Sequence, residues 1–568
     1  MNEPTERIVD HTFARWVRAR SGSDLLARAA FEALRDEGQG HSCAMLSSDE
    51  IDVSALRSHA WVGDGDAFTP FVLTDGEKFY LWRNWRHETR LAEAIRARTG
   101  GRRTPVDAAQ LASDVAELFR GTDATATAAQ RAAVAAVPGA RLFVLTGGPG
   151  TGKTATVLRM VLMLLRHAEA CGWEHAPTVA LAAPTGKAAQ RMAQSVAAGK
   201  VELQRNLGAS SPFLSLLDYV PHAQAQTLHR LLDYRPRENT FARGIDSPLA
   251  ADIVIVDETS MVDLAMMRQL FDAVRPDAVI ILLGDPAQLY AVEAGSVLGD
   301  IVAAGSSLQN EMVTLRHVWR AQDDLNRSLD ALRDGDAAWC DVLVANGNVD
   351  AVRWRSCTDE ASLRTAVAAW MDLHAEAFAT VMGDASDPAS AFRALRSNQI
   401  LCALRESAFG SHGINALVLD SLSKRFDIDV TGEWYHGRPV IVTRNDYARD
   451  LYNGDVGIAL REGGHLRVWF ESLDRNGAPS LRSFSTRTLP AHESAWAITI
   501  HRSQGSEYGE VAVVLPPQAD QRILSRELLY TALSRATQRV ELWTSADSLR
   551  AAAARPVQRR GGLRQRLR

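Results

Sequence analysis

The chain has 568 residues, of which 46% are hydrophobic, and its formal net charge is −5. This length exceeds what a single hydrophobic core organises, so we expect roughly three or four domains. The charge argues against a protein that coats nucleic acid with uniform positive charge, although it allows a local cationic channel. Five widely spaced cysteines fit neither a disulfide framework nor a zinc or iron–sulfur site, and no apolar run is long enough to span a membrane. We therefore expect a cytoplasmic protein without a membrane segment.

A complete phosphate-binding loop occupies residues 147–154, which read Gly147-Gly148-Pro149-Gly150-Thr151-Gly152-Lys153-Thr154. An apolar stretch at 141–146 precedes it, and apolar residues at helical spacing follow over 155–169. This context predicts a buried strand, then the loop, then a helix. The glycines let backbone N–H groups converge on a phosphate at the helix N-terminus, where Lys153 reaches the β- and γ-phosphates and Thr154 ligates Mg²⁺. The loop therefore predicts binding of ATP with Mg²⁺.

Three further apolar stretches predict strands that end in polar side chains. The strand at 253–256 is followed by Asp257 and Glu258, which suit a Mg²⁺ ligand and a base that orients the attacking water. The strand at 278–283 leads to Gln288, an amide able to sense the γ-phosphate. The strand at 179–183 leads to Lys187, which suits a nucleic-acid phosphate. Together with the strand before the loop, these predict four parallel strands in one sheet.

In this order and spacing, the phosphate loop and the segments APTGKAA (183–189), VDETSM (256–261) and GDPAQL (284–289) resemble superfamily 1 DNA helicases. Downstream, residues 315–320 resemble the arginine motif that opens the second motor domain, 498–507 the DNA-contacting segment, and 529–536 the arginine-finger helix. The resemblance implies an α/β fold with two RecA-like parallel-sheet motor domains. It also implies an ATP-hydrolysing helicase that acts on single-stranded DNA and duplex ends.

By the same resemblance, Arg320 and Arg535 would reach the γ-phosphate from the second motor domain when the two domains close over ATP. Gln130 would read adenine, and Glu507 would lie in the nucleotide site. The expected DNA contacts are Thr185, Lys187, His229, Asn453, Thr499, His501 and Gln504. His229 and His501 could equally be ordinary hydrogen-bonded polar residues.

The segments at 227–232 and 256–264, with the long gap between 315 and 498, resemble the RecD-type branch, which implies 5′-to-3′ movement. Residues 40–43 and 79–86 resemble RecD subunits of the heterotrimeric RecBCD helicase-nuclease (exodeoxyribonuclease V). RecB-like and RecC-like partners are then implied, with a role in double-strand-break repair by homologous recombination and in degradation of linear DNA. No Asp-x-Lys or Glu-x-Lys pattern accompanies the five lysines, so we expect the nuclease on another subunit.

The expected domains follow from these motifs and from runs of short β-like segments punctuated by Gly and Asn-Gly turns. They are a small helical N-terminal partner-interaction domain (1–120), the ATP-binding first motor domain (121–310), the second motor domain (311–430 and 491–550), an inserted SH3-like barrel (431–490) and a basic tail (551–568). We expect the tail to be a solvated end rather than a contact with DNA or a partner.

Two other functions stay open at this point. The chain could be a self-sufficient RecD-like helicase that acts without RecB and RecC, or an ATP-gated clamp that hydrolyses ATP without moving along DNA. Retention of Glu258, Gln288, Arg320 and Arg535 together favours a cycling motor over a clamp, because a switch can lose one of them.

Overall fold

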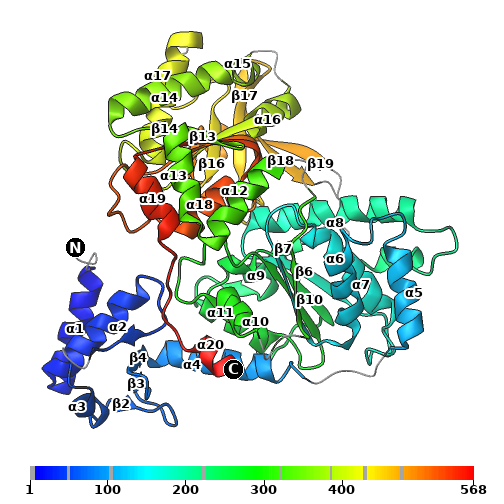
Figure 1. The fold of residues 1–568 in the computed structure, drawn as a ribbon, viewed down its shortest axis with the longest axis vertical. Helices are drawn as coiled ribbons and strands as arrows, with labels where there is room; N and C mark the ends of the chain where they lie inside the picture. Colours follow the sequence, from blue (N-terminus) through cyan, green and yellow to red (C-terminus); the bar gives the residue numbers. More distant parts are fainter. Residues whose placement is uncertain are drawn as a thin grey trace.

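The computed structural model describes residues 7–47, 51–100, 106–220, 225–305, 308, 310–319, 323–383, 387–426, 432–473 and 479–568. Two sheet-centred domains lie one above the other, and a smaller N-terminal domain lies beside the lower one (Figure 1). In the described part of the chain, no helix combines the length and the apolar character needed to cross a bilayer.

The first α/β domain is built on a six-stranded sheet in the order β12-β5-β11-β10-β6-β7, with parallel pairing throughout. Its strands are β5 (Leu142–Gly147), β6 (Val179–Ala183), β7 (Ala225–Thr227), β10 (Ile253–Val256), β11 (Val279–Gly284) and β12 (Met312–Leu315). The four strands expected from the sequence are confirmed as neighbours in one sheet. Because they run parallel, their carboxyl ends and the motifs that follow them meet at one edge.

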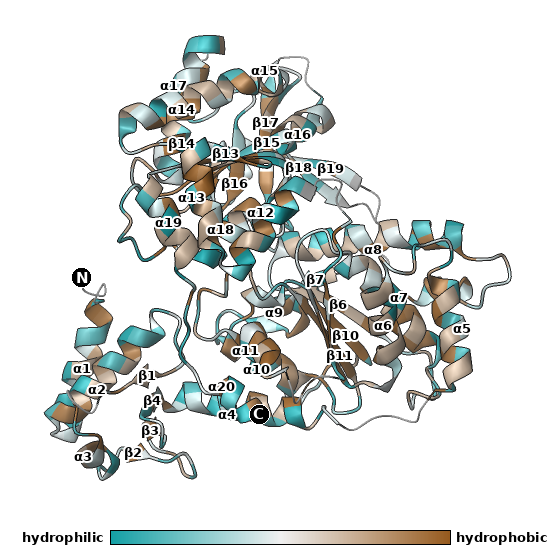
Figure 2. Ribbon diagram, in the orientation of Figure 1, coloured by the Kyte–Doolittle hydropathy of each residue, from teal (hydrophilic) through white to brown (hydrophobic). Residues whose placement is uncertain are grey.

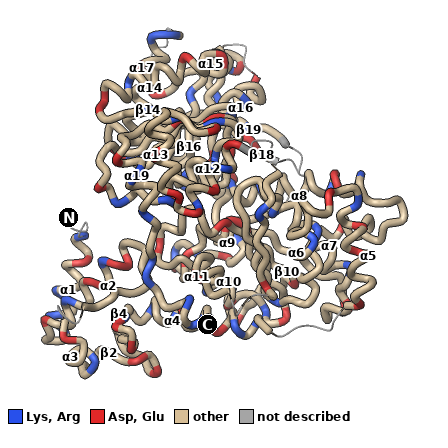
Figure 3. The backbone as a smooth tube through the Cα atoms, in the orientation of Figure 1, with Lys and Arg blue, Asp and Glu red and all other residues tan. Residues whose placement is uncertain are grey.

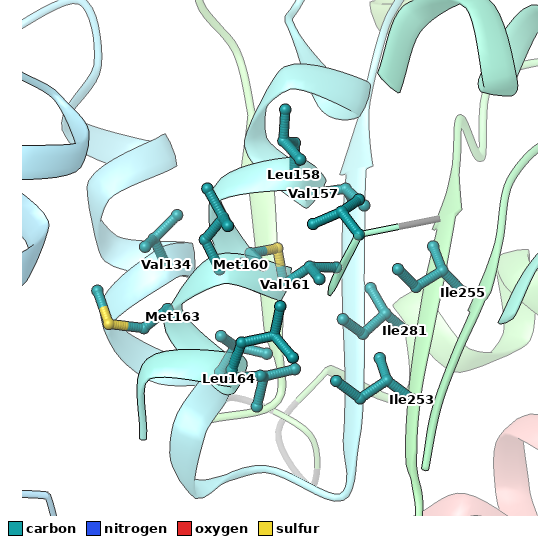
Figure 4. Close-up of a cluster of buried hydrophobic side chains, with 14 of the residues drawn as sticks. Val134, Val157, Leu158, Met160, Val161, Met163, Leu164, Ile253, Ile255 and Ile281 are labelled. Carbon is teal, nitrogen blue, oxygen red and sulfur yellow. The ribbon is translucent and has the colours of Figure 1, made fainter. Parts of the chain in front are cut away.

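Helices cover both faces of this sheet. On one face lie α5 (Ala108–Leu118), α6 (Ala128–Ala136), α7 (Lys153–Arg166) and α8 (Gly186–Asn206); on the other lie α4 (Trp82–Arg96), α9 (Leu228–Leu231), α10 (Leu264–Ala273) and α11 (Val297–Ala303). Figure 4 shows Val157, Val161 and Leu164 of α7 facing the isoleucines of β10 and β11. Strands buried on both faces need continuous apolar runs, which is why β10 and β11 are brown in Figure 2.

The second α/β domain has a sheet in the order β13-β14-β23-β22-β15-β21, parallel except for the β13–β14 pair. Its strands are β13 (Asn348–Val349), β14 (Val352–Ser356), β15 (Asn398–Cys402), β21 (Ala497–Thr499), β22 (Tyr508–Val514) and β23 (Ala536–Thr544). Its helices are α12 (Asp323–Asp334), α13 (Ala337–Asn346), α14 (Glu360–Leu373), α15 (Ala375–Met382), α16 (Pro388–Ser397), α17 (Ser411–Phe426), α18 (Arg526–Leu533) and α19 (Ala546–Ala554).

An antiparallel five-stranded sheet, β19-β18-β17-β16-β20, is inserted in this domain. It consists of β16 (Pro439–Val442), β17 (Val456–Glu462), β18 (His465–Leu473), β19 (Pro479–Ser485) and β20 (His492–Ser494). Val440, Val442, Val468 and Phe470 form its small core. The short β-like segments expected in the inserted region are therefore strands in the structure. A separate hairpin, β8 (Tyr234–Arg235) and β9 (Thr240–Phe241), belongs to the first α/β domain, where Phe241 packs against its core.

The N-terminal region, expected to be helical, contains a sheet as well. Helices α1 (Ile8–Ser21), α2 (Asp24–Glu37) and α3 (Val53–Arg57) accompany a four-stranded sheet of β1 (Ala44–Met45), β2 (Val62–Gly63), β3 (Phe71–Leu73) and β4 (Lys78–Leu81). The strands have two to four residues, which is too short for a clear alternating pattern.

The expectation of a solvated C-terminal tail is wrong. After α19 the chain returns to the first α/β domain, where α20 (Leu563–Leu567) packs on α4 and α11. Leu563 and Leu567 are only 1% and 3% exposed. Two leucines in a five-residue helix make too short a pattern to reveal an amphipathic face. The many arginines around them instead favour the prediction of a solvated segment.

Candidate nucleotide site and nucleic-acid interface

The phosphate loop joins the buried strand β5 to helix α7. Gly150 and Gly152 have φ angles of +75° and +81°, a left-handed conformation that other residues rarely adopt. A Cβ on Gly152 would also lie 2.6 Å from Nε2 of Gln130. Nζ of Lys153 donates to the carbonyl oxygens of Gly147 and Gly148 at 2.7 and 3.0 Å. The loop thus holds an ammonium group beside the N-terminus of α7, where both favour a phosphate.

Two carboxylates follow β10 at the neighbouring position in the sheet. The backbone N–H of Glu258 donates to Oδ1 of Asp257 at 2.8 Å, and Glu258 itself has a φ angle of +51°. This left-handed conformation is strained for a residue with a side chain, and such strain clusters at functional sites. Burial and the charge of Glu258 raise the pKa of Asp257, while Lys153 opposes the rise. A divalent cation bound there would relieve this repulsion.

A buried hydrogen-bond cluster follows β11. Asp285 accepts from the backbone N–H of Ala287 at 3.0 Å, from Nε2 of Gln288 at 3.3 Å and from the hydroxyl of Tyr530 at 3.0 Å. Oε1 of Gln288 is buried and has no hydrogen-bond partner among the residues that the structure describes. Because a buried polar atom normally has a partner, this oxygen is suited to a ligand in the adjacent cavity.

That cavity lies between the two α/β domains and has a volume of about 630 Å³. The first domain contributes the loop, both carboxylates and Gln288, and the second contributes Glu507 and Arg535. The structure therefore brings together these residues expected at the site: Gln130, Pro149, Gly150, Thr151, Gly152, Lys153, Thr154, Asp257, Glu258, Gln288, Glu507 and Arg535. Gly147 and Gly148 hold Lys153 as described above. Arg320 lies outside the described residues.

Arg535 is buried and bonded within its own domain. Its Nη1 donates to the Ser506 carbonyl at 3.3 Å and its Nη2 to Oγ of Ser534 at 2.9 Å. Glu507 pairs with Arg191 of α8 and so links the two domains across the cavity.

Sequence reasoning missed several residues of the site. Trp319 donates its backbone N–H to the Gly150 carbonyl at 2.9 Å, and Tyr530 reaches Asp285 from the second domain. Phe119 lines the cavity, with the guanidinium groups of Arg131 and Arg159 each 4.9 Å from its ring centre. Trp319 and Tyr530 lie inside the motifs at 315–320 and 529–536, so those motifs could have indicated both residues. Phe119 lies in no motif, so nothing in the sequence indicated its place in the site.

A second cavity, of about 520 Å³, lies between the first α/β domain and the antiparallel sheet. Tyr452 lies against the N-terminus of α8, because a Cβ on Gly186 would be 2.6 Å from its Cγ. Thr185 caps α8 through a 3.2 Å bond from the Ala188 N–H, and Asn453 is exposed in the facing loop. Lys187 lines the adjoining cavity of about 350 Å³. Three of the expected DNA contacts, Thr185, Lys187 and Asn453, thus lie along the border between the first α/β domain and the antiparallel sheet.

The other expected DNA contacts lie elsewhere. His229 packs against the rings of Tyr234 and Phe241 at 5.3 and 5.9 Å, and burial lowers its pKa. Burial also lowers the pKa of His501. Oγ1 of Thr499 accepts from the Arg502 N–H at 3.4 Å. Gln504 is buried, and its Nε2 donates to the Leu289 carbonyl of the first domain at 3.4 Å, so in this structure it joins the two domains.

Comparison with known proteins gives consistent matches. The AAA domain family matches residues 130–294, and the UvrD-like helicase C-terminal domain family matches 494–542. The chain is 37% identical over 509 residues to "RecBCD enzyme subunit RecD" of Mycolicibacterium smegmatis, covering 88% of this chain and 84% of that protein. The corresponding protein of Haemophilus influenzae is 30% identical over 528 residues, with 85% and 79% covered.

Two more distant similarities accompany these. The "ATP-dependent RecD2 DNA helicase" of Deinococcus radiodurans is 30% identical over 538 residues, which cover 93% of this chain but 61% of that protein. Among solved structures, the Pif1 helicase of Candida albicans is 16% identical and has a TM-score of 0.35, with 73% and 93% of the chains covered. Given its identity to RecD proteins along most of both chains, the chain belongs to the RecD family of RecBCD enzyme subunits.

Proposed function

We propose that this chain is an ATP-dependent DNA helicase that moves 5′ to 3′ and acts as the motor subunit of a RecBCD-like complex. The observation that carries the proposal is the cavity between the two α/β domains. Its lining comes from both domains, so a nucleotide bound there would contact both. Hydrolysis and release would then change how the domains approach each other, which is what a translocating motor requires.

Each residue of the cavity has a role in this proposal. Lys153 binds the β- and γ-phosphates, and Glu258 orients and deprotonates the attacking water. Gln288 senses the γ-phosphate by donating from its amide Nε2, while its buried Oε1 can accept from the attacking water. Thr154 and Asp257 are oxygen donors of the kind that Mg²⁺ prefers, and Mg²⁺ supplies positive charge beside the transferring phosphoryl group when bound. Arg535 stabilises the charge of the transition state once the domains close, joined by Arg320.

The proposed path for single-stranded DNA follows the border between the first α/β domain and the antiparallel sheet. Thr185, Lys187 and Asn453 flank this border, and Tyr452 offers an aromatic face. A groove of this kind binds backbone phosphates and stacks bases without reading their sequence. We assign the antiparallel sheet, including β20 just beyond the expected 431–490, as the SH3-like barrel. The two α/β domains are the proposed motor domains, and the first extends beyond the expected 121–310 because α4, α5 and β12 belong to it.

The N-terminal domain is the proposed contact with RecB-like and RecC-like subunits. Large apolar side chains are exposed on it, with Ile8 86%, Trp16 52% and Phe68 72% accessible. Exposed apolar and aromatic side chains on one small domain favour a protein interface.

The alternative is a self-sufficient helicase related to RecD2. One observation favours it: the similarity to the Deinococcus radiodurans protein extends over 93% of this chain. Against it, the identity is higher to the Mycolicibacterium smegmatis RecD protein, at 37% compared with 30%.

The deciding experiment measures ATP-driven unwinding of partial duplexes that carry either a 5′ or a 3′ single-stranded tail. The chain is assayed alone and with RecB-like and RecC-like subunits. We expect unwinding from the 5′ tail only, with strong dependence on the added subunits. Full activity of the chain alone would favour the self-sufficient helicase, and unwinding from the 3′ tail alone would refute the direction. DNA-stimulated hydrolysis without any unwinding would favour a clamp.

A further inference from the structure

The C-terminal segment 555–567, here called the strap, links the second α/β domain to helices α4 and α11 of the first α/β domain. At its start, the Arg555 carbonyl accepts from the Arg526 N–H at 2.8 Å, and the Val557 N–H donates to Oε2 of Glu527 at 2.8 Å. At its end, α20 is buried against α4. In Figure 1 the connection runs from α19 to α20, and Figure 3 shows basic residues along it.

Arg559 is the residue at which the strap reaches the first α/β domain. Its Nη2 donates to the Ala291 carbonyl, and its Nη1 donates to the carbonyls of Glu293 and Gly295. The guanidinium also lies 5.9 Å from the ring centre of Tyr290. All four residues belong to the loop that carries Gln288. A guanidinium that binds three carbonyls of one loop fixes the conformation of that loop.

The same guanidinium is bound by the N-terminal domain. Its Nη1 donates to the Gly40 carbonyl at 3.2 Å, and that carbonyl also accepts from the Gly295 N–H at 2.9 Å. A Cβ on Gly40 would lie 2.4 Å from Cζ of Arg559, and the φ angle of Gly40 is +85°. The adjacent Arg560 N–H donates to Nδ1 of His41 at 3.0 Å. The turn at 40–43 is therefore shaped to receive the strap.

The Gln288 loop is also bonded to the rest of the site. The Leu289 N–H donates to Oγ1 of Thr531 in α18 at 2.9 Å, and the Ala291 N–H donates to the Ser260 carbonyl at 3.1 Å. Ser260 follows Glu258 by two residues. The carbonyls that Arg559 binds thus lie on the segment that connects Gln288 with the carboxylate segment and with α18.

We propose that Arg559 is a positioning residue for ATP hydrolysis. It holds the Gln288 loop in place and ties that loop to the N-terminal domain and, through the bonds of Arg555 and Val557, to the second α/β domain. A displacement of the N-terminal domain by a partner subunit would then be transmitted to Gln288 through the Gly40–Arg559 contact. The inference rests on the proposed function, because it assigns a consequence to Gln288 in ATP turnover.

The test compares Arg559→Ala and Gly40→Ala with Gly22→Ala in the full chain. Gly22 is the matched control, because it lies in the same domain with a φ angle of +72° and has nothing within 4 Å of an added Cβ. DNA-stimulated ATP hydrolysis gives kcat and KM, and hydrogen exchange of the 288–295 amides is measured without nucleotide. Gly40→Ala keeps the arginine, so it decides the question if Arg559→Ala does not fold.

We expect Arg559→Ala and Gly40→Ala each to lower kcat about tenfold at unchanged KM, since small displacements of positioned groups have effects of at least this size. The double variant should lose no more than either single variant, and exchange at 288–295 should be faster in all three. Gly22→Ala should match the wild type. Unchanged kcat and exchange in Gly40→Ala, or equal losses in Gly22→Ala, would overturn the inference. A wild-type chain without DNA-stimulated hydrolysis would instead refute the proposed function, while the exchange result would still report on the strap.

Discussion

Lys153 is the residue on which the nucleotide assignment depends most directly. Its ammonium group is bonded to two carbonyls of the loop, and glutamine at this position would remove the charge while leaving a polar side chain. We expect Lys153→Gln to lower ATP turnover by at least about a hundredfold, because charge stabilisation of the phosphoryl group is the main catalytic effect in such enzymes. Affinity for DNA without nucleotide, measured by equilibrium titration, should change little. Turnover at the wild-type rate would refute the site.

Tyr530 provides a test of the contact between the domains at the end of β11. Its hydroxyl donates to the buried carboxylate of Asp285 at 3.0 Å, and leaving such a group short of a hydrogen bond costs about 1–3 kcal/mol. We expect Tyr530→Phe to lower kcat for ATP by about tenfold with KM unchanged, the equivalent of about 1.4 kcal/mol. Tyr435→Phe is the matched control, because Tyr435 is also a buried tyrosine, bonded to Trp496 in the second domain. Equal losses in both variants would indicate general destabilisation.

At the scale of elements, helices α4, α11 and α20 meet around two carboxylates, Asp300 and Glu88. Burial and the nearby charge of Glu88 raise the pKa of Asp300 to about 7, although Arg564 and Lys78 oppose the rise. At a pH between the unfolded pKa, near 4, and the folded pKa, the carboxyl of Asp300 is protonated in the folded state and ionised in the unfolded state. The contribution of Asp300 to stability is therefore present at acidic pH and is lost as the pH rises through about 7.

Asp300→Asn should consequently stabilise the protein at pH 8 and have a smaller effect at pH 5. We expect about 1 kcal/mol at pH 8, which is less than a shift of roughly three pKa units at 1.36 kcal/mol each would give, because Asp300 is partly exposed and solvent screens its charge. Thermal unfolding at both pH values measures the difference. Asp246→Asn, in an exposed loop, serves as the control and should change the stability equally at pH 5 and pH 8. A pH-independent effect of Asp300→Asn would contradict the assignment.

At the scale of the whole molecule, the proposed mechanism makes hydrolysis depend on closure of the two α/β domains. Arg535 lines the cavity but is bonded to Ser506 and Ser534 in its own domain. If it becomes the arginine finger on closure, Arg535→Ala should lower the hydrolysis rate by about 10³ to 10⁵. Nucleotide affinity should fall far less, and both are measured by single-turnover kinetics and titration.

Closure of the two α/β domains can be followed by measuring the distance between a label on each domain. All five cysteines are buried, so cysteines introduced at the exposed positions Val201 and Leu373 accept labels selectively. We expect a non-hydrolysable ATP analogue to change the distance between these labels on the first and second domains, in the wild type and in Arg535→Ala. A distance that does not respond to nucleotide would argue against a closing motor.

Several parts of the site were predictable because the signal is local. The strand, loop and helix around Lys153 form one continuous segment, and its apolar periodicity and glycines are visible without any distant contact. Asp257, Glu258 and Gln288 could be placed beside it because parallel strands bring their carboxyl ends to one sheet edge. The short strands of the N-terminal domain and helix α20 could not be predicted, since neither is long enough to show a period.

What the sequence by itself determined is the chemistry of each motif and the parallel sheet that gathers the motifs of the first domain. The tertiary structure alone decided which distant groups complete them. Tyr530 and Asp285 are 245 residues apart, and Gly40 and Arg559 are 519 apart. Such contacts arise from the packing of whole domains, which no local period encodes. The physical reason is that a turn or a strand depends on neighbours in the chain, whereas an interdomain hydrogen bond depends on how complete surfaces fit together.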